Sequence, residues 1–199
     1  MGIAMRSMRR FPSLIVAAGL AAMSMVTPAT AQQPFSTTTG LRDGQRDFDW
    51  EVGTWETQVR VLRNPLSGAT PDWAEFRGTS VVRPILDGRA NSVELSVRGD
   101  KGLIEGVALR LYNPQTRQWN INYASIRGGT LTAPIFGGFD GKGRGEFYGQ
   151  EMIDGRAIQV RFVITSVSTR EARFEQSYSA DGGKSWETNW IAIDTRRTK

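Results

Sequence analysis

The sequence predicts an all-β domain whose antiparallel strands form a sandwich or a barrel. Ten short segments alternate apolar and polar residues, as half-buried strands do. The links between them carry turn-forming sequences such as Asn113-Pro114, Asp154-Gly155 and Asp181-Gly182-Gly183. No segment after residue 31 has the 3.6-residue apolar period of a core helix. Many short strands at nearly regular spacing are typical of antiparallel sandwiches and barrels.

The first 31 residues have the features of a secretory signal peptide. Arg6, Arg9 and Arg10 form a basic region, an apolar run spans residues 11–26, and Ala29-Thr30-Ala31 is an A-x-A cleavage site. A proline and several small or polar residues shorten the run below the ~20 apolar residues that a membrane span needs. We expect cleavage after Ala31 and export to the periplasm or the exterior of a bacterial cell. Residues 32–42, which are rich in Ser and Thr, are expected to form a flexible tether, and residues 43–196 to form one folded domain.

The composition excludes several kinds of chemistry. The 199 residues include no cysteine and no histidine, which excludes disulfides, thiolate nucleophiles, Ser-His-Asp triads, His/Cys zinc sites and His-ligated haem. We therefore expect no metal and no cofactor. The formal charge of +5 includes three leader arginines, and the remaining charges alternate in sign. Neither nucleic acid nor, after cleavage of the leader, a membrane is therefore an expected partner. The oligomeric state stays open.

The expected strands begin after a turn or single helical turn over residues 41–48. They span residues 54–62, 74–83, 92–98, 104–112, 118–126, 130–136, 145–152, 158–166, 172–179 and 185–194. Alternation sorts their side chains onto two faces. The apolar even-numbered residues of 158–164 share one face, and Val107, Leu109 and Leu111 share another, with Arg110 opposite them. One dry face and one wet face is the antiparallel pattern.

The register of the last hairpin follows from its aromatic residues. If the loop spans residues 180–184, Tyr178 faces Trp186 and Phe174 faces Trp190. A slip by one residue would invert every side chain and mix aromatic with charged residues, so this register is the expected one. It places six residues on the inner face: Phe174, Gln176, Tyr178, Trp186, Thr188 and Trp190.

Residues 179–186 match the Asp-box pattern S-x-D-x-G-x-S-W. In this hairpin turn the aspartate, here Asp181, accepts hydrogen bonds from the backbone. Propellers that carry the box repeat it in several four-stranded blades, whereas this chain contains it once. Asp181 and Trp186 are therefore expected to be structural, and the box does not indicate a glycosidase.

Residues 137–145 form a glycine-rich stretch with two possible interpretations. A phosphate-binding loop would need a helix directly after it. Glu146-Phe147-Tyr148 has the character of a strand instead, which favours a hairpin tip or a loop at a barrel mouth.

Without histidine, acid–base chemistry must come from Glu, Asp, Lys or Tyr, with Arg as an anion clamp. The candidates near strand centres are Glu94, Arg110, Glu146, Tyr148, Arg161 and Glu175. Most lie on the polar face by parity and are expected to form solvated cross-strand ion pairs. In the strand of Glu146 and Tyr148, apolar and polar residues do not separate onto two faces. These two are therefore the candidate catalytic residues if the protein is an enzyme.

Four segments carry a family resemblance: residues 47–55, with Asp47-Phe48-Asp49-Trp50 and Gly53-Thr54-Trp55, and residues 109–114, 144–149 and 181–190. In order and spacing they resemble a bacterial family of unknown function, whose small, often exported members are similar to lipocalin-like and nitrobindin-like barrels. The resemblance implies an up-and-down barrel of about ten antiparallel strands around a pocket. It implies structural roles for Gly53, which permits a close approach, and Trp55, which closes one barrel end. It implies no activity, and the histidine through which nitrobindins bind haem is absent.

Three functions remain as hypotheses. The first is the binding of a small apolar or aromatic molecule in the lumen, with Phe162, Phe174 and Trp190 as apolar walls and with Tyr123, Gln176 and Thr188 orienting its polar groups. The second is a cofactor-independent lyase, isomerase or hydratase in the same lumen. The third is a surface or assembly module whose barrel is filled by its own side chains.

Overall fold

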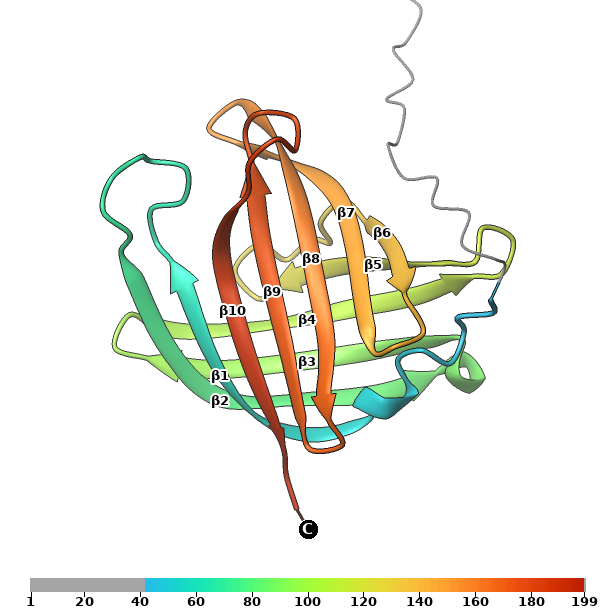
Figure 1. The fold of residues 1–199 in the computed structure, drawn as a ribbon. Coiled ribbons are helices and arrows are strands. Elements are labelled where there is room, and N and C mark those ends of the chain that lie inside the picture. The colour runs from blue at the N-terminus through green and yellow to red at the C-terminus, as the bar shows by residue number, and fades with distance from the viewer. Residues whose placement is uncertain (1–41, 199) are drawn as a thin grey trace, which may run out of the picture. The chain divides into compact units, whose positions relative to one another are not determined.

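The computed structural model describes residues 42–198, in which ten strands close into one antiparallel barrel (Figure 1). Successive strands pair along the chain, and the pairing of β1 with β10 closes the sheet. The strands are β1 (Gly53–Leu62), β2 (Trp73–Ile85), β3 (Ala90–Gly99), β4 (Gly102–Asn113), β5 (Gln118–Ser125), β6 (Ile135–Phe139), β7 (Arg144–Ile153), β8 (Arg156–Ser168), β9 (Glu171–Ser179) and β10 (Glu187–Arg196). The prediction of an all-β, up-and-down barrel of about ten strands is confirmed.

Besides the strands, residues 42–198 contain two short 3-10 helices, η1 (Asp49–Glu51) and η2 (Leu86–Gly88). No helix in this part of the chain has the length and the apolar character needed to cross a bilayer. The expected signal peptide, residues 1–31, and the expected tether, residues 32–42, lie outside the described residues, Arg42 excepted.

Two strands start later than the sequence predicts. The strand expected over residues 130–136 begins at Ile135, because Pro134 has no N–H to donate to a ladder and Thr132 bonds back to β5, its N–H to the carbonyl of Tyr123 at 2.7 Å. The strand expected from residue 185 begins at Glu187, because Ser185 belongs to the Asp-box turn.

The segment of residues 43–52 crosses one end of the barrel, which we call the plug end. Phe48 is 1 % exposed and packs edge-on against Trp119 and Phe139, with ring centroids 4.9 Å apart in each pair. The indole of Trp119 donates a hydrogen bond to the carbonyl of Gly44 at 2.8 Å. Burial of such rings stabilises the fold by about 1.5–3 kcal/mol each, so the plug is part of the hydrophobic core.

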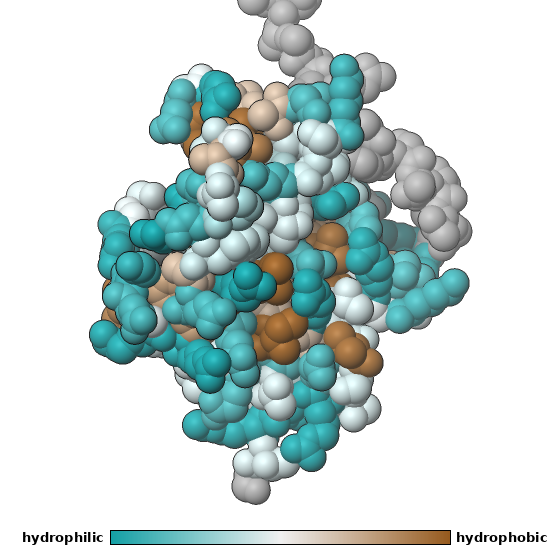
Figure 2. Space-filling view, turned by 60° about the vertical axis from the view of Figure 1, so that its left-hand side comes forward, coloured by the Kyte–Doolittle hydropathy of each residue, from teal (hydrophilic) through white to brown (hydrophobic). Residues whose placement is uncertain are grey.

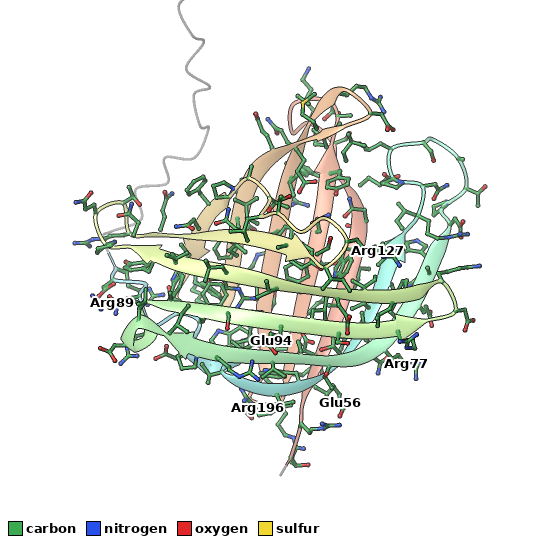
Figure 3. All side chains as sticks on the ribbon, turned by 180° about the vertical axis from the view of Figure 1, so that it is seen from behind. Glu56, Arg77, Arg89, Glu94, Arg127 and Arg196 are labelled. Carbon is green, nitrogen blue, oxygen red and sulfur yellow. The ribbon has the colours of Figure 1, made fainter. Side chains whose placement is uncertain are left out.

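Arg196, at the end of β10, joins the last strand to the first strand and to the plug segment. Its guanidinium carbon lies 4.1 Å from the ring centroid of Trp55 in β1. The same guanidinium donates hydrogen bonds to the carbonyls of Trp50, Val52 and Thr169. Figure 3 labels Arg196 at the end of the barrel from which the C-terminal segment leaves. One side chain therefore fastens the seam at which the sheet closes.

The G-x-W residues Gly53 and Trp55 lie directly at this seam. Trp55 is 1 % exposed, and its indole N–H donates to the carbonyl of Glu51 at 2.7 Å. Gly53 has a φ of 134°, and a Cβ atom there would lie 2.9 Å from Nη1 of Arg196. The glycine therefore allows both the backbone conformation and the close approach of the arginine.

The inner and outer faces agree with the sequence for β8 and not for β4. In β8, Ile158, Val160 and Ile164 are at most 3 % exposed and face the interior. In β4 the expectation that Arg110 lies on the wet face is wrong, because Arg110 is 6 % exposed inside the barrel and Val107 is 38 % exposed outside it. The arginine is kept inside by an ion pair with the plug segment, described below.

The predicted register of the last hairpin is also wrong. Tyr178 pairs with Glu187 instead of Trp186, and a bulge at Asn189 then shifts the pairing again, so that Trp190 lies opposite Gln176. Trp190 and Gln176 still face the interior, whereas Thr188 and Trp186 lie on the outer face. Outside the barrel, Trp186 packs against Arg161, whose guanidinium carbon lies 4.6 Å from its ring centroid.

We predict that Arg196→Ala lowers the free energy of unfolding by about 2–3 kcal/mol, because three carbonyls lose a charged donor and Trp55 loses its stacked cation. Urea unfolding followed by tryptophan fluorescence measures the change. The matched control is Arg197→Ala, which removes an exposed pair with Glu56 and should change stability by at most about 0.5 kcal/mol. Equal effects of the two substitutions would contradict a special role of Arg196 at the seam.

Candidate functional site

A cavity of about 190 Å³ lies inside the barrel. Phe162 and Phe174 form one wall, with their rings edge-on and their centroids 4.5 Å apart, and Trp190 lies on the next strand. Smaller apolar residues complete the lining: Val59, Val93, Leu95, Ala108, Ile121, Ala133, Ile135, Ile164, Ala172 and Ala192. Polar and charged side chains interrupt this lining toward both ends of the barrel.

Asp194 lies on the cavity lining toward the plug end. The hydroxyl of Thr57 in β1 donates to its Oδ1 at 2.5 Å, and the hydroxyl of Ser80 in β2 lies 3.2 Å from the same oxygen. The two hydroxyl oxygens are 2.6 Å apart. Burial raises the pKa of Asp194 to about 6, against the opposing effect of the Thr57 hydrogen bond, and the nearby Glu51 carboxylate raises it further.

Glu51 and Arg110 form a buried ion pair beside this aspartate. Nη1 and Nη2 of Arg110 donate to the two carboxylate oxygens of Glu51 at 2.5 and 3.2 Å. The guanidinium also lies over the ring of Phe48, 4.2 Å from its centroid. Because the two side chains are only 7 % and 12 % exposed, removal of either one would leave a buried charge without its partner.

A second polar group lies near the opposite end of the lumen. Glu151 of β7 lines the cavity, and the hydroxyl of Tyr178 donates to its Oε2 at 3.2 Å. Gln176 also lines the cavity and donates its amide to Oδ1 of the bulged residue Asn189 at 3.1 Å. Burial raises the pKa of the Glu151 carboxyl and of the Tyr178 hydroxyl above their ordinary values.

Five of the six residues that the sequence assigns to ligand binding line this cavity: Tyr123, Phe162, Phe174, Gln176 and Trp190. The sixth, Thr188, does not. It pairs with Ser177, its hydroxyl 3.2 Å from the hydroxyl of that serine, and neighbouring residues of a strand face opposite sides. The bulge at Asn189 is the reason, because it reverses the alternation between Thr188 and Trp190. The binding roles of the other five stay predictions.

The candidate catalytic residues Glu146 and Tyr148 lie on the outer face of the barrel. The Tyr148 hydroxyl donates to Glu146 at 2.6 Å, and Arg144 pairs with the same carboxylate at 2.5 Å. The hydrogen bond from Tyr148, followed by Arg144, lowers the pKa of Glu146, while burial and Glu146 raise that of Tyr148 to about 12. Neither residue lines the cavity, because the neighbouring Phe147, which is fully buried, occupies the inner position.

The Asp box forms the turn between β9 and β10. Asp181 accepts hydrogen bonds from the backbone N–H groups of Lys184 and Ser185 at 3.0 and 2.9 Å and from the Ser185 hydroxyl at 2.6 Å. These hydrogen bonds, that of the Ser185 hydroxyl first, lower the pKa of Asp181 well below its ordinary value. Trp186 closes the turn with a hydrogen bond to the carbonyl of Gly183 at 3.1 Å. Among the described residues the box takes part in local structure, away from the cavity lining.

The sequence analysis missed the charged residues of the lumen, namely Glu51, Arg110, Glu151 and Asp194. Two of them could have been identified by continuing the inward–outward alternation of side chains to the ends of β10 and β7. Asp194 follows Trp190 and Ala192 at a spacing of two, and Glu151 follows Phe147 at a spacing of four. For Glu51 and Arg110 the sequence offers no comparable signal, since the two residues meet only in the folded barrel.

The lumen does not fit the haem of nitrobindin-like barrels. The chain contains no histidine ligand, and a cavity of about 190 Å³ is smaller than the ~300–1,000 Å³ of pockets for drug-sized ligands. No group of three or more carboxylates that could hold a metal ion occurs within residues 42–198.

No protein-family model matches the sequence, and no curated protein matches it. Similar solved structures include EF1p2_mFAP2b bound to DFHBI, with 13 % identity, a TM-score of 0.43 and coverage of 77 % of this chain and 99 % of that one. A de novo designed fluorescence-activating β-barrel has 13 % identity, a TM-score of 0.40 and coverage of 78 % and 99 %. A redesigned β-barrel has 11 % identity, a TM-score of 0.39 and coverage of 77 % and 96 %. These similarities concern the barrel architecture alone.

The raised pKa of Asp194 makes stability depend on pH in a defined direction. The folded protein, with a pKa of about 6, holds the proton more tightly than the unfolded chain, whose pKa is near 3.8. Protonation therefore favours folding as pH falls from 7 to 4, and this contribution is lost as pH rises through 6. Relative to Asp194→Asn, the wild-type protein should gain about 2–3 kcal/mol of unfolding free energy between about pH 7 and pH 4.

Urea unfolding of both proteins at the two pH values measures this difference, and contributions of other carboxyl groups cancel in the comparison. Glu56→Gln, on the outer face of β1, serves as the control and should track the wild-type protein. A pH-independent difference between wild type and Asp194→Asn would show that Asp194 has an ordinary pKa.

Proposed function

We propose that the protein is an exported barrel that binds a small, mainly apolar or aromatic molecule in its lumen. The observation that carries the proposal is the cavity of about 190 Å³ bounded by Phe162, Phe174 and Trp190. These side chains leave an apolar space with polar groups toward both ends, which is the usual composition of a ligand pocket.

The size of the cavity limits the ligand. An apolar cavity of ~150 Å³ in another protein takes up benzene, so about 190 Å³ suits a single ring with a short substituent. Tyr123 and Gln176 contribute a hydroxyl and an amide to the lining, which would orient a polar substituent.

The location and the family also remain proposals. Export with cleavage after Ala31 is supported by the basic region, apolar run and A-x-A site of the first 31 residues. Membership of a bacterial family of exported, lipocalin-like and nitrobindin-related barrels is supported by the four segments named above and by the ten-strand topology.

A second candidate is a cofactor-independent lyase, isomerase or hydratase. It is favoured by one observation, that two carboxyl groups with raised pKa, Asp194 and Glu151, line the same cavity. Carboxyl groups of this kind can act as general acids or bases near neutral pH. Asp194→Asn or Glu151→Gln would abolish turnover if this function holds, whereas a binding protein has no turnover to lose.

The third hypothesis, an assembly module with a filled barrel, loses its support because the lumen contains a cavity. On the face shown in Figure 2, hydrophobic side chains form several separate groups among hydrophilic ones. A continuous apolar surface, which an assembly module would favour, is not seen on that face.

Filling the cavity should remove binding without unfolding the barrel. We predict that Ala108→Leu, whose added carbons enter the cavity, weakens binding of any lumen ligand by about tenfold or more, with a stability change within about 1–2 kcal/mol. Tryptophan fluorescence and thermal shift against a panel of aromatic and aliphatic compounds provide the measurement.

The control is Ala124→Leu, at the position paired with Val107 on the outer face, which should bind like the wild-type protein. Lumen binding would be excluded if no compound of the panel changed either signal in the wild-type protein, or if Ala108→Leu bound as tightly as Ala124→Leu.

A further inference from the structure

The two carboxylate oxygens of Asp194 have different surroundings. Both neighbouring hydroxyls, of Thr57 and Ser80, approach Oδ1. No residue within 42–198 donates a hydrogen bond to Oδ2, and this atom is not among the fully enclosed polar atoms without a partner. Asp194 lines the cavity and is only partly buried, so Oδ2 is open to a donor that enters the cavity.

The charge of Asp194 is also unpaired. Arg110, whose charge acts on Asp194 without direct contact, is engaged at both terminal nitrogens by Glu51, and Arg173 pairs with Glu175. No lysine or arginine of the described part of the chain forms an ion pair with Asp194 or with Glu151. The cavity therefore has an excess of negative charge, with one carboxylate toward each end.

This arrangement discriminates between ligands by charge. An anionic ligand would be repelled by two carboxylates in a low-dielectric lumen. A neutral apolar ligand would cover Oδ2 and leave it desolvated without a donor. A ligand with an ammonium group would supply both a counter-charge and hydrogen-bond donors, which form the stronger, charge-assisted kind of hydrogen bond. The carboxylate is already withdrawn from water by folding, so binding adds little further desolvation of the protein.

We propose that the lumen binds a small organic amine, whose ammonium group pairs with Oδ2 of Asp194 and whose apolar body lies against Phe162, Phe174 and Trp190. This inference rests on the proposed lumen binding and specifies the class of its ligand. The aromatic walls suit the apolar body of such a ligand, because aromatic rings pack well against apolar and aromatic groups.

The test compares three compounds of nearly equal size that differ in charge: benzylamine, benzyl alcohol and benzoate. Titration calorimetry of the purified protein at about pH 7.5, where amines and carboxylates are both charged, should show benzylamine binding at least about tenfold more tightly than benzyl alcohol. Benzoate should bind least. Asp194→Asn, which keeps the shape and removes the charge, should lose that preference and bind benzylamine and benzyl alcohol alike.

Glu56→Gln is the matched control, because Glu56 lies on the outer face of β1 beside Thr57 and pairs with the exposed Arg197. It should retain the wild-type preference for benzylamine. If it loses that preference to the same degree as Asp194→Asn, the proposal is overturned, since a general change of charge would then explain the effect.

A second measurement needs no variant and covers the case in which Asp194→Asn does not fold. The groups that face Asp194 are the hydroxyls of Thr57 and Ser80 and the paired Glu51 and Arg110. Benzylamine stays protonated between about pH 5 and pH 8, so its affinity should fall about tenfold as Asp194 is protonated below pH 6. The affinity for benzyl alcohol should change little over the same range.

The outcomes separate this inference from the proposed function. Equal affinity of the wild-type protein for benzylamine and benzyl alcohol would overturn the amine as ligand and leave lumen binding intact. Undiminished benzylamine binding by Asp194→Asn would also overturn the amine as ligand and leave lumen binding intact. If none of the three compounds binds and the wider panel also gives no response, both lumen binding and the amine are overturned.

Discussion

The contact of Arg196 with Trp55 is the interaction on which the rest of the barrel depends. A sheet of ten strands closes only if its first and last strands meet, and here they meet with the guanidinium 4.1 Å from the indole ring. The same group donates to backbone carbonyls of the plug segment and of the β8–β9 hairpin. Arg196 therefore links the closure of the sheet, made by the backbone pairing of β1 with β10, to the position of the plug.

The plug in turn determines the chemistry of the lumen. Glu51 is held by the turn that positions Trp55, and Arg110 is drawn inward to pair with it. With Arg110 engaged, Asp194 has hydroxyl partners and no counter-ion. A largely apolar cavity thus has a carboxyl group without a counter-ion at a fixed position on its lining.

The sequence predicted the parts of the structure that local patterns control. The alternation of apolar and polar residues predicted the strands and the inner face of β8. Ile158, Val160 and Ile164 are buried because they are apolar, and their burial requires no particular distant partner. The alternation failed for β4, since the buried position of Arg110 depends on Glu51, 59 residues away. It failed in the last hairpin because nothing in Thr188-Asn189-Trp190 marks a bulge, and because Trp186 packs outside on Arg161. The lumenal residues of β5, β8 and β9 were found because their strands contain no such irregularity near them.

The bulge at Asn189 gives the chain an uneven tolerance of changes in length. Turns such as that between β7 and β8 can gain or lose residues with no effect on which way the strands face. In β10, however, Trp190, Ala192 and Asp194 point inward because one extra residue precedes them. The loss of a single residue there would turn an aromatic wall and the lumenal carboxylate toward water, unless the strand slid along both neighbours. Which side chains of β10 line the cavity therefore depends on the number of residues before Trp190. The extra residue, Asn189, does not itself line the cavity.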